Sequence, residues 1–140
     1  MADQPSVFSR IIAGDLPSRA VYADDDVVAF LSIAPLTLGH TLVVPRAQVD
    51  RWEGIDPALW GHLSAVAQRI GQAVRTAFGS DRVGVVVAGF EVPHVHVHVF
   101  PADGMDDFDF AHARPRSDEQ MDDAATRLRA ALGDAAATSL

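Results

Sequence analysis

The alternation of apolar and polar positions predicts one long helix in the middle of the chain. Apolar side chains recur at spacings of three and four through residues 59–74, the repeat that places them on one helix face. Asp56 followed by Pro57 is typical of a helix start, with the carboxylate as its cap, and Gly79 is typical of a helix end. We interpret the apolar face as core, and His62, which lies off it, as a surface residue.

Two shorter helices are expected near the ends of the chain. Ser6 can cap a short helix that ends at Gly14. Ser117 and Gln120 have the spacing of a capping box. This pattern predicts a last amphipathic helix that ends at Gly133 and is followed by a frayed tail.

Five short apolar runs have the length and the flanking turn residues of β-strands. They cover residues 19–22, 27–31, 40–45, 82–88 and 94–99. The three consecutive aspartates after the first run are expected to form a hairpin turn. The fourth run is mostly valine, which predicts a strand buried on both faces. This order of elements predicts an α+β fold, in which the long helix packs on an antiparallel sheet of about five strands.

Residues 102–116 form an acidic segment in which Phe108 and Phe110 alternate with aspartates. The simplest interpretation is an extended arm that packs two aromatic rings against the domain. An edge of the functional site, or a contact with a partner, is the alternative.

Three histidines alternate with three valines over residues 94–99. Alternation is the period of a strand, so His94, His96 and His98 are expected on one face, with the valines in the core. Such a row supports two chemistries. The imidazoles can bind a metal ion together with ligands from elsewhere, or one imidazole can attack phosphorus while its neighbours orient it. A strand whose histidines merely face water is the remaining interpretation.

Composition narrows the class of protein. A chain of 140 residues is expected to form one domain, residues 1–140. The formal charge of −8 opposes binding to DNA or RNA, and the absence of cysteine excludes disulfides and thiolate metal ligands. No apolar run approaches a membrane span and the first residues lack a signal-peptide pattern, so we expect a cytoplasmic protein with no membrane partner.

The histidine run resembles the signature of the histidine-triad (HIT) superfamily, His-φ-His-φ-His-φ-φ with φ apolar. It stands here as residues 94–100, a full match. Four upstream segments are also similar to the family: residues 8–18, 21–25, 29–31 and 35–45. The resemblance therefore covers residues 6–101 and leaves 102–140 as a divergent arm, helix and tail.

The resemblance implies a hydrolase or transferase acting on the α-phosphate of a nucleotide derivative, nearest to the nucleoside phosphoramidase branch. His96 would be the nucleophile, with the backbone carbonyl of His94 holding its far ring nitrogen. His98 would contact the phosphate or the leaving group, and His40 would support the triad from a neighbouring strand. The mechanism requires no metal and no cofactor.

Relatives are typically homodimers with the long helix at the interface, so the resemblance implies a homodimer. Leu59, Trp60 and Leu63 would contribute to that surface or, equally, to the core of one chain.

Some positions depart from the family pattern. Many relatives hold a structural zinc ion through Cys-x-x-Cys and a later histidine, where this chain has Ser6, Ser9 and Gln48, so we predict no metal there. Ser32 stands where relatives carry an acidic residue that holds the ribose.

The loop before the triad is short, and Gly89 and Phe90 stand in place of a phosphate-binding Gly-Gln pair. We assign substrate binding to Ser32, Ile33, Gly89 and Phe90. Two alternatives to a hydrolase stay open, and the departures favour the first of them. One is a nucleotide-binding HIT protein with little turnover, and the other is a metal-dependent protein that uses the histidine row.

Overall fold

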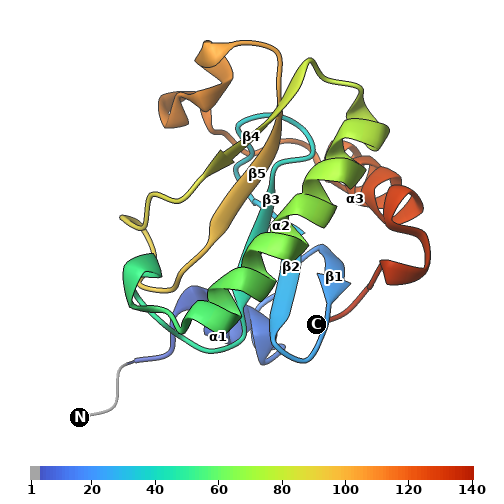
Figure 1. Ribbon diagram of the computed structural model, residues 1–140. Coiled ribbons are helices and arrows are strands. Elements are labelled where there is room, and N and C mark those ends of the chain that lie inside the picture. The colour runs from blue at the N-terminus through green and yellow to red at the C-terminus, as the bar shows by residue number, and fades with distance from the viewer. Residues whose placement is uncertain (1–3) are drawn as a thin grey trace.

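The computed structural model describes residues 4–140 and has an antiparallel sheet of five strands in the order β1-β2-β3-β5-β4 (Figure 1). The strands are β1 (Ala20–Ala23), β2 (Val27–Leu31), β3 (Thr41–Pro45), β4 (Arg82–Val86) and β5 (Val97–Ala102). The helices are α1 (Val7–Ile12), α2 (Pro57–Phe78) and α3 (Asp118–Leu132). The predicted α+β fold with a five-stranded sheet is confirmed.

The long helix α2 covers one face of the sheet. Six of its apolar residues, among them Leu63 and Ile70, are buried against the inward-facing residues of β2, β3 and β5. Leu63 is therefore core and not surface, whereas Leu59 and Trp60 are only partly buried. Asp56 occupies the cap position as predicted, but its side chain makes no capping hydrogen bond, so Pro57 and the packing of the helix define its start.

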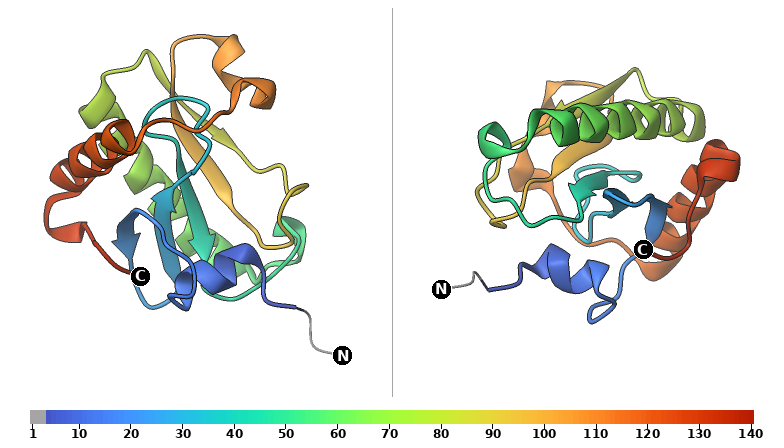
Figure 2. Two further views of the ribbon diagram at one scale, coloured as in Figure 1. Left: turned by 180° about the vertical axis from the view of Figure 1, so that it is seen from behind. Right: turned by 60° about the horizontal axis from the view of Figure 1, so that its bottom comes forward.

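The opposite face of the sheet carries a second, smaller core beneath α1. Figure 2 shows α2 on one side of the sheet and α1 on the other. Ser6 caps α1, because its Oγ accepts a hydrogen bond from the backbone N–H of Ser9 at 2.9 Å. The helix places Phe8 against Phe30, with ring centroids 5.6 Å apart. The central strands are consequently buried on both faces.

The strand β4 is an edge strand, and the prediction that both of its faces are buried is wrong. Val85 keeps 58% of its surface exposed, and only Gly84 in this strand is buried. A run of valines does not distinguish a central strand from an edge strand, because that difference depends on which strand pairs where.

The C-terminal part of the chain packs against the first strand. The capping box of α3 is confirmed, with hydrogen bonds from the N–H of Gln120 to Ser117 Oγ and from the N–H of Ser117 to Gln120 Oε1. The predicted frayed tail is wrong. Ala136 pairs with Tyr22, and the N–H of Ala137 donates to the carbonyl of Val21 at 2.8 Å, so the tail continues the sheet edge.

Residues 102–116 are not extended throughout, because two 3₁₀ turns, Met105–Phe108 and Phe110–His112, interrupt the arm. The prediction that the arm packs two aromatic rings is confirmed. Phe108 lies edge-on to Phe100, and Phe110 lies edge-on to His98, each with ring centroids 4.9 Å apart. Within residues 4–140, none of the helices is both long and apolar enough to cross a membrane.

Two glycines with positive φ give a matched test of packing. At Gly39 (φ 105°) an added Cβ would lie 2.5 Å from the ring of Phe78, whereas at Gly79 (φ 62°) it would meet nothing within 4 Å. We expect Gly39→Ala to lower the free energy of unfolding by about 3 kcal/mol and Gly79→Ala by about 1 kcal/mol. Urea unfolding measures both, and equal losses would contradict the close approach at Gly39.

Candidate active site

The histidine row lies at the start of β5. The strand begins at Val97, three residues later than predicted, but the segment before it is held in place because the N–H of Val95 donates to the carbonyl of Val49 at 2.7 Å. Val95, Val97 and Val99 all join the large core. His94, His96 and His98 point away from that core, and all three are buried.

His96 is held in one tautomer. Its Nδ1 lies 2.7 Å from the carbonyl oxygen of His94, and a carbonyl can only accept a hydrogen bond. The proton therefore sits on Nδ1, and the lone pair is left on Nε2. The ring of Phe8 packs edge-on against this imidazole, with centroids 4.9 Å apart. The arrangement presents a fixed, neutral ring with a free nucleophilic nitrogen.

His94 is fully buried and has a fixed tautomer as well. Its Nε2 lies 2.7 Å from the carbonyl oxygen of Pro45 and must donate to it. Its Nδ1 then accepts a hydrogen bond from the hydroxyl of Ser6, and Ser6 Oγ lies 2.6 Å from this Nδ1. Both ring nitrogens are thus used by the protein, so this side chain anchors the backbone that supports His96.

A third chain of hydrogen bonds orients His98. The N–H of Leu36 donates to Nδ1 of His40 at 3.0 Å, so the ring proton of His40 is on Nε2. That Nε2 lies 2.9 Å from Nδ1 of His98, which must accept. The proton of His98 is therefore on Nε2, where the ring can donate a hydrogen bond to a bound ligand.

Burial keeps these imidazoles neutral. It lowers the pKa of His40 to about 3 and the pKa of His98 to about 4, with neighbouring imidazoles adding to the effect. Burial also lowers the pKa values of His94 and His96, against the hydrogen bonds to Pro45 and His94. A nucleophilic imidazole must be unprotonated, so the environment favours the reactive form of His96 near neutral pH.

A cavity of about 440 Å³ opens over the histidines on the α1 side of the sheet. His40, His96 and His98 line it, together with Ser32 and Ile33. Most of its other walls are apolar and come from α1, β2 and the arm; they include Phe8, Ile11, Phe30, Leu31 and Phe110. We call it the main cavity.

A second cavity, also of about 440 Å³, is lined by His96 as well. Gly89 and Phe90 line this one, and so does the loop after β3, residues 50–53. We call it the Trp52 cavity. The residues expected to bind substrate are thus divided, because Ser32 and Ile33 lie in the main cavity and Gly89 and Phe90 in the Trp52 cavity.

Comparison with known proteins identifies the family of this chain. The pattern of the HIT domain matches residues 13–105. The chain belongs to the HIT domain family. An uncharacterized HIT-like protein of Methanocaldococcus jannaschii is 39% identical over 101 residues, which are 68% of this chain and 77% of that protein. The adenylylsulfatase HINT3 of Arabidopsis thaliana is 28% identical over 127 residues, 87% of this chain and 64% of that protein.

Solved structures of the family share the fold. A Hit-like protein involved in cell-cycle regulation from Bartonella henselae superposes with a TM-score of 0.81 at 30% identity, covering 94% of this chain and 99% of that one. A hypothetical histidine triad nucleotide-binding protein from Sulfolobus tokodaii superposes with a TM-score of 0.80 at 25% identity, covering 89% of this chain and 90% of that one.

The positions of the HIT zinc ligands form a hydrogen-bonded cluster in this chain. Ser9 Oγ donates to Gln48 Oε1 at 2.7 Å, and the N–H of Ser6 donates to the same oxygen at 2.7 Å. Neutral hydroxyl and amide oxygens do not fit zinc, which prefers thiolate, imidazole and carboxylate ligands. Across residues 4–140, moreover, no group of three or more histidines, aspartates or glutamates is arranged to hold a metal ion.

Two contributors to the site were missed in the sequence. Phe110 was assigned first to packing, with an edge of the functional site only as an alternative for its segment, yet its ring forms a wall of the main cavity against His98. Nothing in the alternation of phenylalanine and aspartate identifies which ring faces the site. The N–H of Leu36, which sets the tautomers of His40 and His98, carries no sequence signal because every residue except proline has this group.

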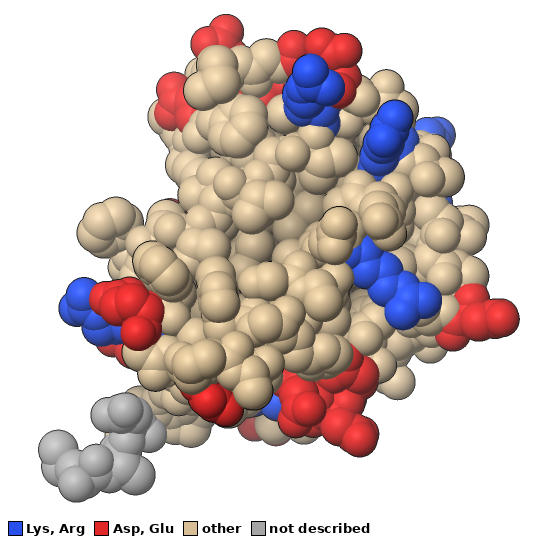
Figure 3. All heavy atoms as spheres, in the orientation of Figure 1, with Lys and Arg blue, Asp and Glu red and all other residues tan. Residues whose placement is uncertain are grey.

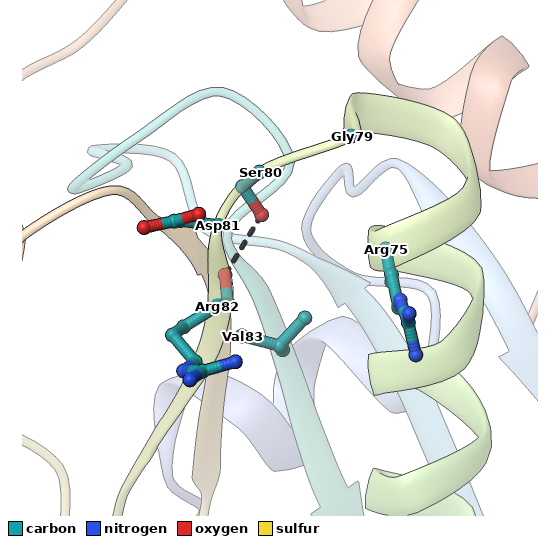
Figure 4. A pocket seen from close by; sticks show the side chains of 6 residues that line it. All are labelled: Arg75, Gly79, Ser80, Asp81, Arg82 and Val83. Carbon is teal, nitrogen blue, oxygen red and sulfur yellow. Dashed lines mark hydrogen bonds between the residues drawn. The ribbon is translucent and has the colours of Figure 1, made fainter.

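A further cavity lies between the end of α2 and the start of β4, and its walls include two arginines. In Figure 4, Arg75 comes from the helix and Arg82 from the strand, with Ser80 Oγ donating to the carbonyl of Arg82 at 2.8 Å. Arg82 pairs with Ala102 at the far end of β5 from the histidines, so this cavity is separate from the HIT site.

The buried histidines predict acid sensitivity. The pKa values of His40 and His98, about 3 and about 4, lie below the ordinary value of 6.5, so the unfolded chain binds more protons below pH 6.5. The free energy of unfolding should therefore be constant above that pH and fall as the pH drops to 4, by about 2 kcal/mol or more. Urea unfolding across this range measures it. His40→Gln should flatten the profile, and a profile that is already flat would refute the neutral buried pair.

Proposed function

We propose that this HIT protein hydrolyses a nucleoside 5′-phosphoramidate or a related nucleotide derivative at its α-phosphorus. The hydrogen bond from Nδ1 of His96 to the carbonyl of His94 carries the proposal, because it leaves Nε2 unprotonated in a ring that lines a cavity. The adenylylsulfatase and the nucleotide-binding protein among its relatives support a nucleotide as the ligand.

In the proposed reaction the substrate reacts with its amide nitrogen protonated. Nε2 of His96 forms a bond to phosphorus while the phosphorus–nitrogen bond breaks, and the bonding pair leaves with the amine. The imidazolium that carries the nucleotidyl group keeps its proton on Nδ1, which still donates a hydrogen bond to the carbonyl of His94. Water then attacks phosphorus, which releases the nucleoside monophosphate and a proton and restores the neutral ring. The Nε2–H of His98 stabilises the phosphoryl oxygens during both steps.

The nucleoside part fits the main cavity. Apolar walls from Phe8, Ile11 and Ile33 suit the faces of a base, and such pockets usually carry a few polar groups that fix orientation. Ser32 supplies one hydroxyl for the ribose, where a carboxylate would accept two hydrogen bonds. This weaker contact favours a second candidate, a nucleotide-binding protein with little turnover.

Replacing the nucleophile separates the two candidates. His96→Ala should abolish the nucleotidyl adduct that rapid quench and mass spectrometry detect with adenosine 5′-phosphoramidate, and should lower kcat by about 10³-fold or more. His62→Ala, which removes a histidine of α2 outside both cavities, is the control and should keep the adduct. Nucleotide binding by calorimetry without turnover in the unmodified protein would favour the second candidate. An adduct on His96→Ala would refute the assigned nucleophile.

The face formed by α2 and β4 is the surface on which we propose that two copies associate. An apolar cavity of about 470 Å³ lies between Trp60, Gly71 and Val85 on this face. In the part of the chain that the structure describes, no strand pairs with the outer edge of β4, and exposed edges favour pairing with another chain. Charged side chains gather toward the rim of the same face in Figure 3.

A charge placed on this face tests the homodimer. Val85 is 58% exposed, so Val85→Glu should leave the fold intact but bring a carboxylate into the apolar contact. We expect sedimentation velocity to show a dimer of the 15.0 kDa chain and a monomer for the variant. Met105→Glu, at a residue that is 79% exposed and outside this cavity, should remain dimeric. A monomeric unmodified protein would end the proposal.

A further inference from the structure

The Trp52 cavity has a composition unlike that of the main cavity. Both share His96, but none of the other histidines lines the Trp52 cavity. A substrate whose phosphorus lies at His96 therefore has room for one part in each of the two cavities. With the nucleoside in the main cavity, the Trp52 cavity is the space that remains for the leaving group.

Two exposed aromatic rings mark this cavity. Trp52 is 49% exposed and Phe90 is 96% exposed, although large apolar side chains gain by burial. Trp52 is also held in place by the ring of Trp60 in α2. The centroids of the two rings are 5.4 Å apart, at an interplanar angle of 38°. A supported indole beside a reactive centre provides a surface for stacking or for a cation over its face.

The charges near His96 are mostly negative. Asp50, Arg51 and Glu53 line the Trp52 cavity, and Glu91 lines the main cavity. Arg51 donates to Glu53 at 2.6 Å, and the salt bridges among residues 4–140 include neither Asp50 nor Glu91. Within residues 4–140, Arg51 is the only arginine that lines either cavity, and the chain contains no lysine. An anionic leaving group would therefore meet repulsion from carboxylates in both cavities.

We propose that the Trp52 cavity binds the leaving group of the substrate and selects an arylalkyl amine over an anion such as sulfate or phosphate. This inference rests on the proposed hydrolysis at phosphorus. Trp52 and Phe90 stack on the aromatic part of the amine, and the carboxylate of Asp50 favours the protonated nitrogen that departs from phosphorus. The same charge disfavours sulfate, the leaving group that the name of the adenylylsulfatase relative implies.

Three substrates that share adenosine 5′-phosphate test the selection. They are the simple phosphoramidate, its N-(2-phenylethyl) derivative and adenosine 5′-phosphosulfate. For each substrate, mass spectrometry measures nucleotidylation of His96 and steady-state kinetics measures kcat/KM. We expect kcat/KM for the phenylethyl compound to exceed that for the simple phosphoramidate by about tenfold, and kcat/KM for the phosphosulfate to be the lowest of the three.

Variants assign the preference to the cavity. Trp52→Ala should reduce the ratio of kcat/KM for the phenylethyl compound to kcat/KM for the simple phosphoramidate to near one. Trp52→Phe should retain most of this preference. Asp50→Asn should raise kcat/KM for the phosphosulfate about threefold or more without a similar gain for the amides. The control is Ile33→Ala in the main cavity, which should change kcat/KM for all three substrates by the same factor and leave the ratios between them unaltered.

The outcomes separate this inference from the proposed function. Labelling of His96 by all three substrates with equal efficiency, or a ratio that Trp52→Ala leaves unchanged, would overturn the leaving-group assignment and leave hydrolysis intact. If none of the three labels His96, the proposed function fails and the assignment fails with it.

Discussion

The structure of the site depends on a simple constraint: a carbonyl oxygen can only accept a hydrogen bond, and a backbone N–H can only donate one. The carbonyls of Pro45 and His94 fix the tautomers of His94 and His96, and the N–H of Leu36 fixes those of His40 and His98. Four imidazoles, each with two possible neutral forms, are thereby reduced to one arrangement. It is an arrangement in which His96 has a free lone pair and His98 has a free N–H.

The fold supports this arrangement by burying both faces of its central strands. One face packs on α2, and the other carries the histidines beneath α1 and the arm. A ring in such a place is largely buried, which keeps it neutral, and packed against its neighbours, which keeps it oriented. Phe8 and Phe110 contribute to both effects, because each lies edge-on against an imidazole of the site.

The departures from the HIT pattern differ in their effect: some preserve the support of His94, whereas others change residues near the expected ligand. At the positions where many relatives hold zinc, this chain has a hydrogen-bonded cluster in which Ser6 supports His94. Ser32 lines the main cavity at the position where relatives carry an acidic residue, and Phe90 is exposed in the short loop before the triad. The anchoring of His94 is therefore retained, whereas the features that bear on the choice of ligand have diverged.

The sequence by itself determined the periodic elements and the alternation that separates three histidines from three valines. Local repeats and caps specify these features, so the strands, α2 and the capping box of α3 were all predictable. Only the tertiary structure decided that β4 lies at the edge, that the tail pairs with Tyr22, and that Phe110 faces His98. It also divided the expected binding residues between two cavities that meet at His96. Each of these depends on contacts between residues distant in sequence, which no local pattern encodes.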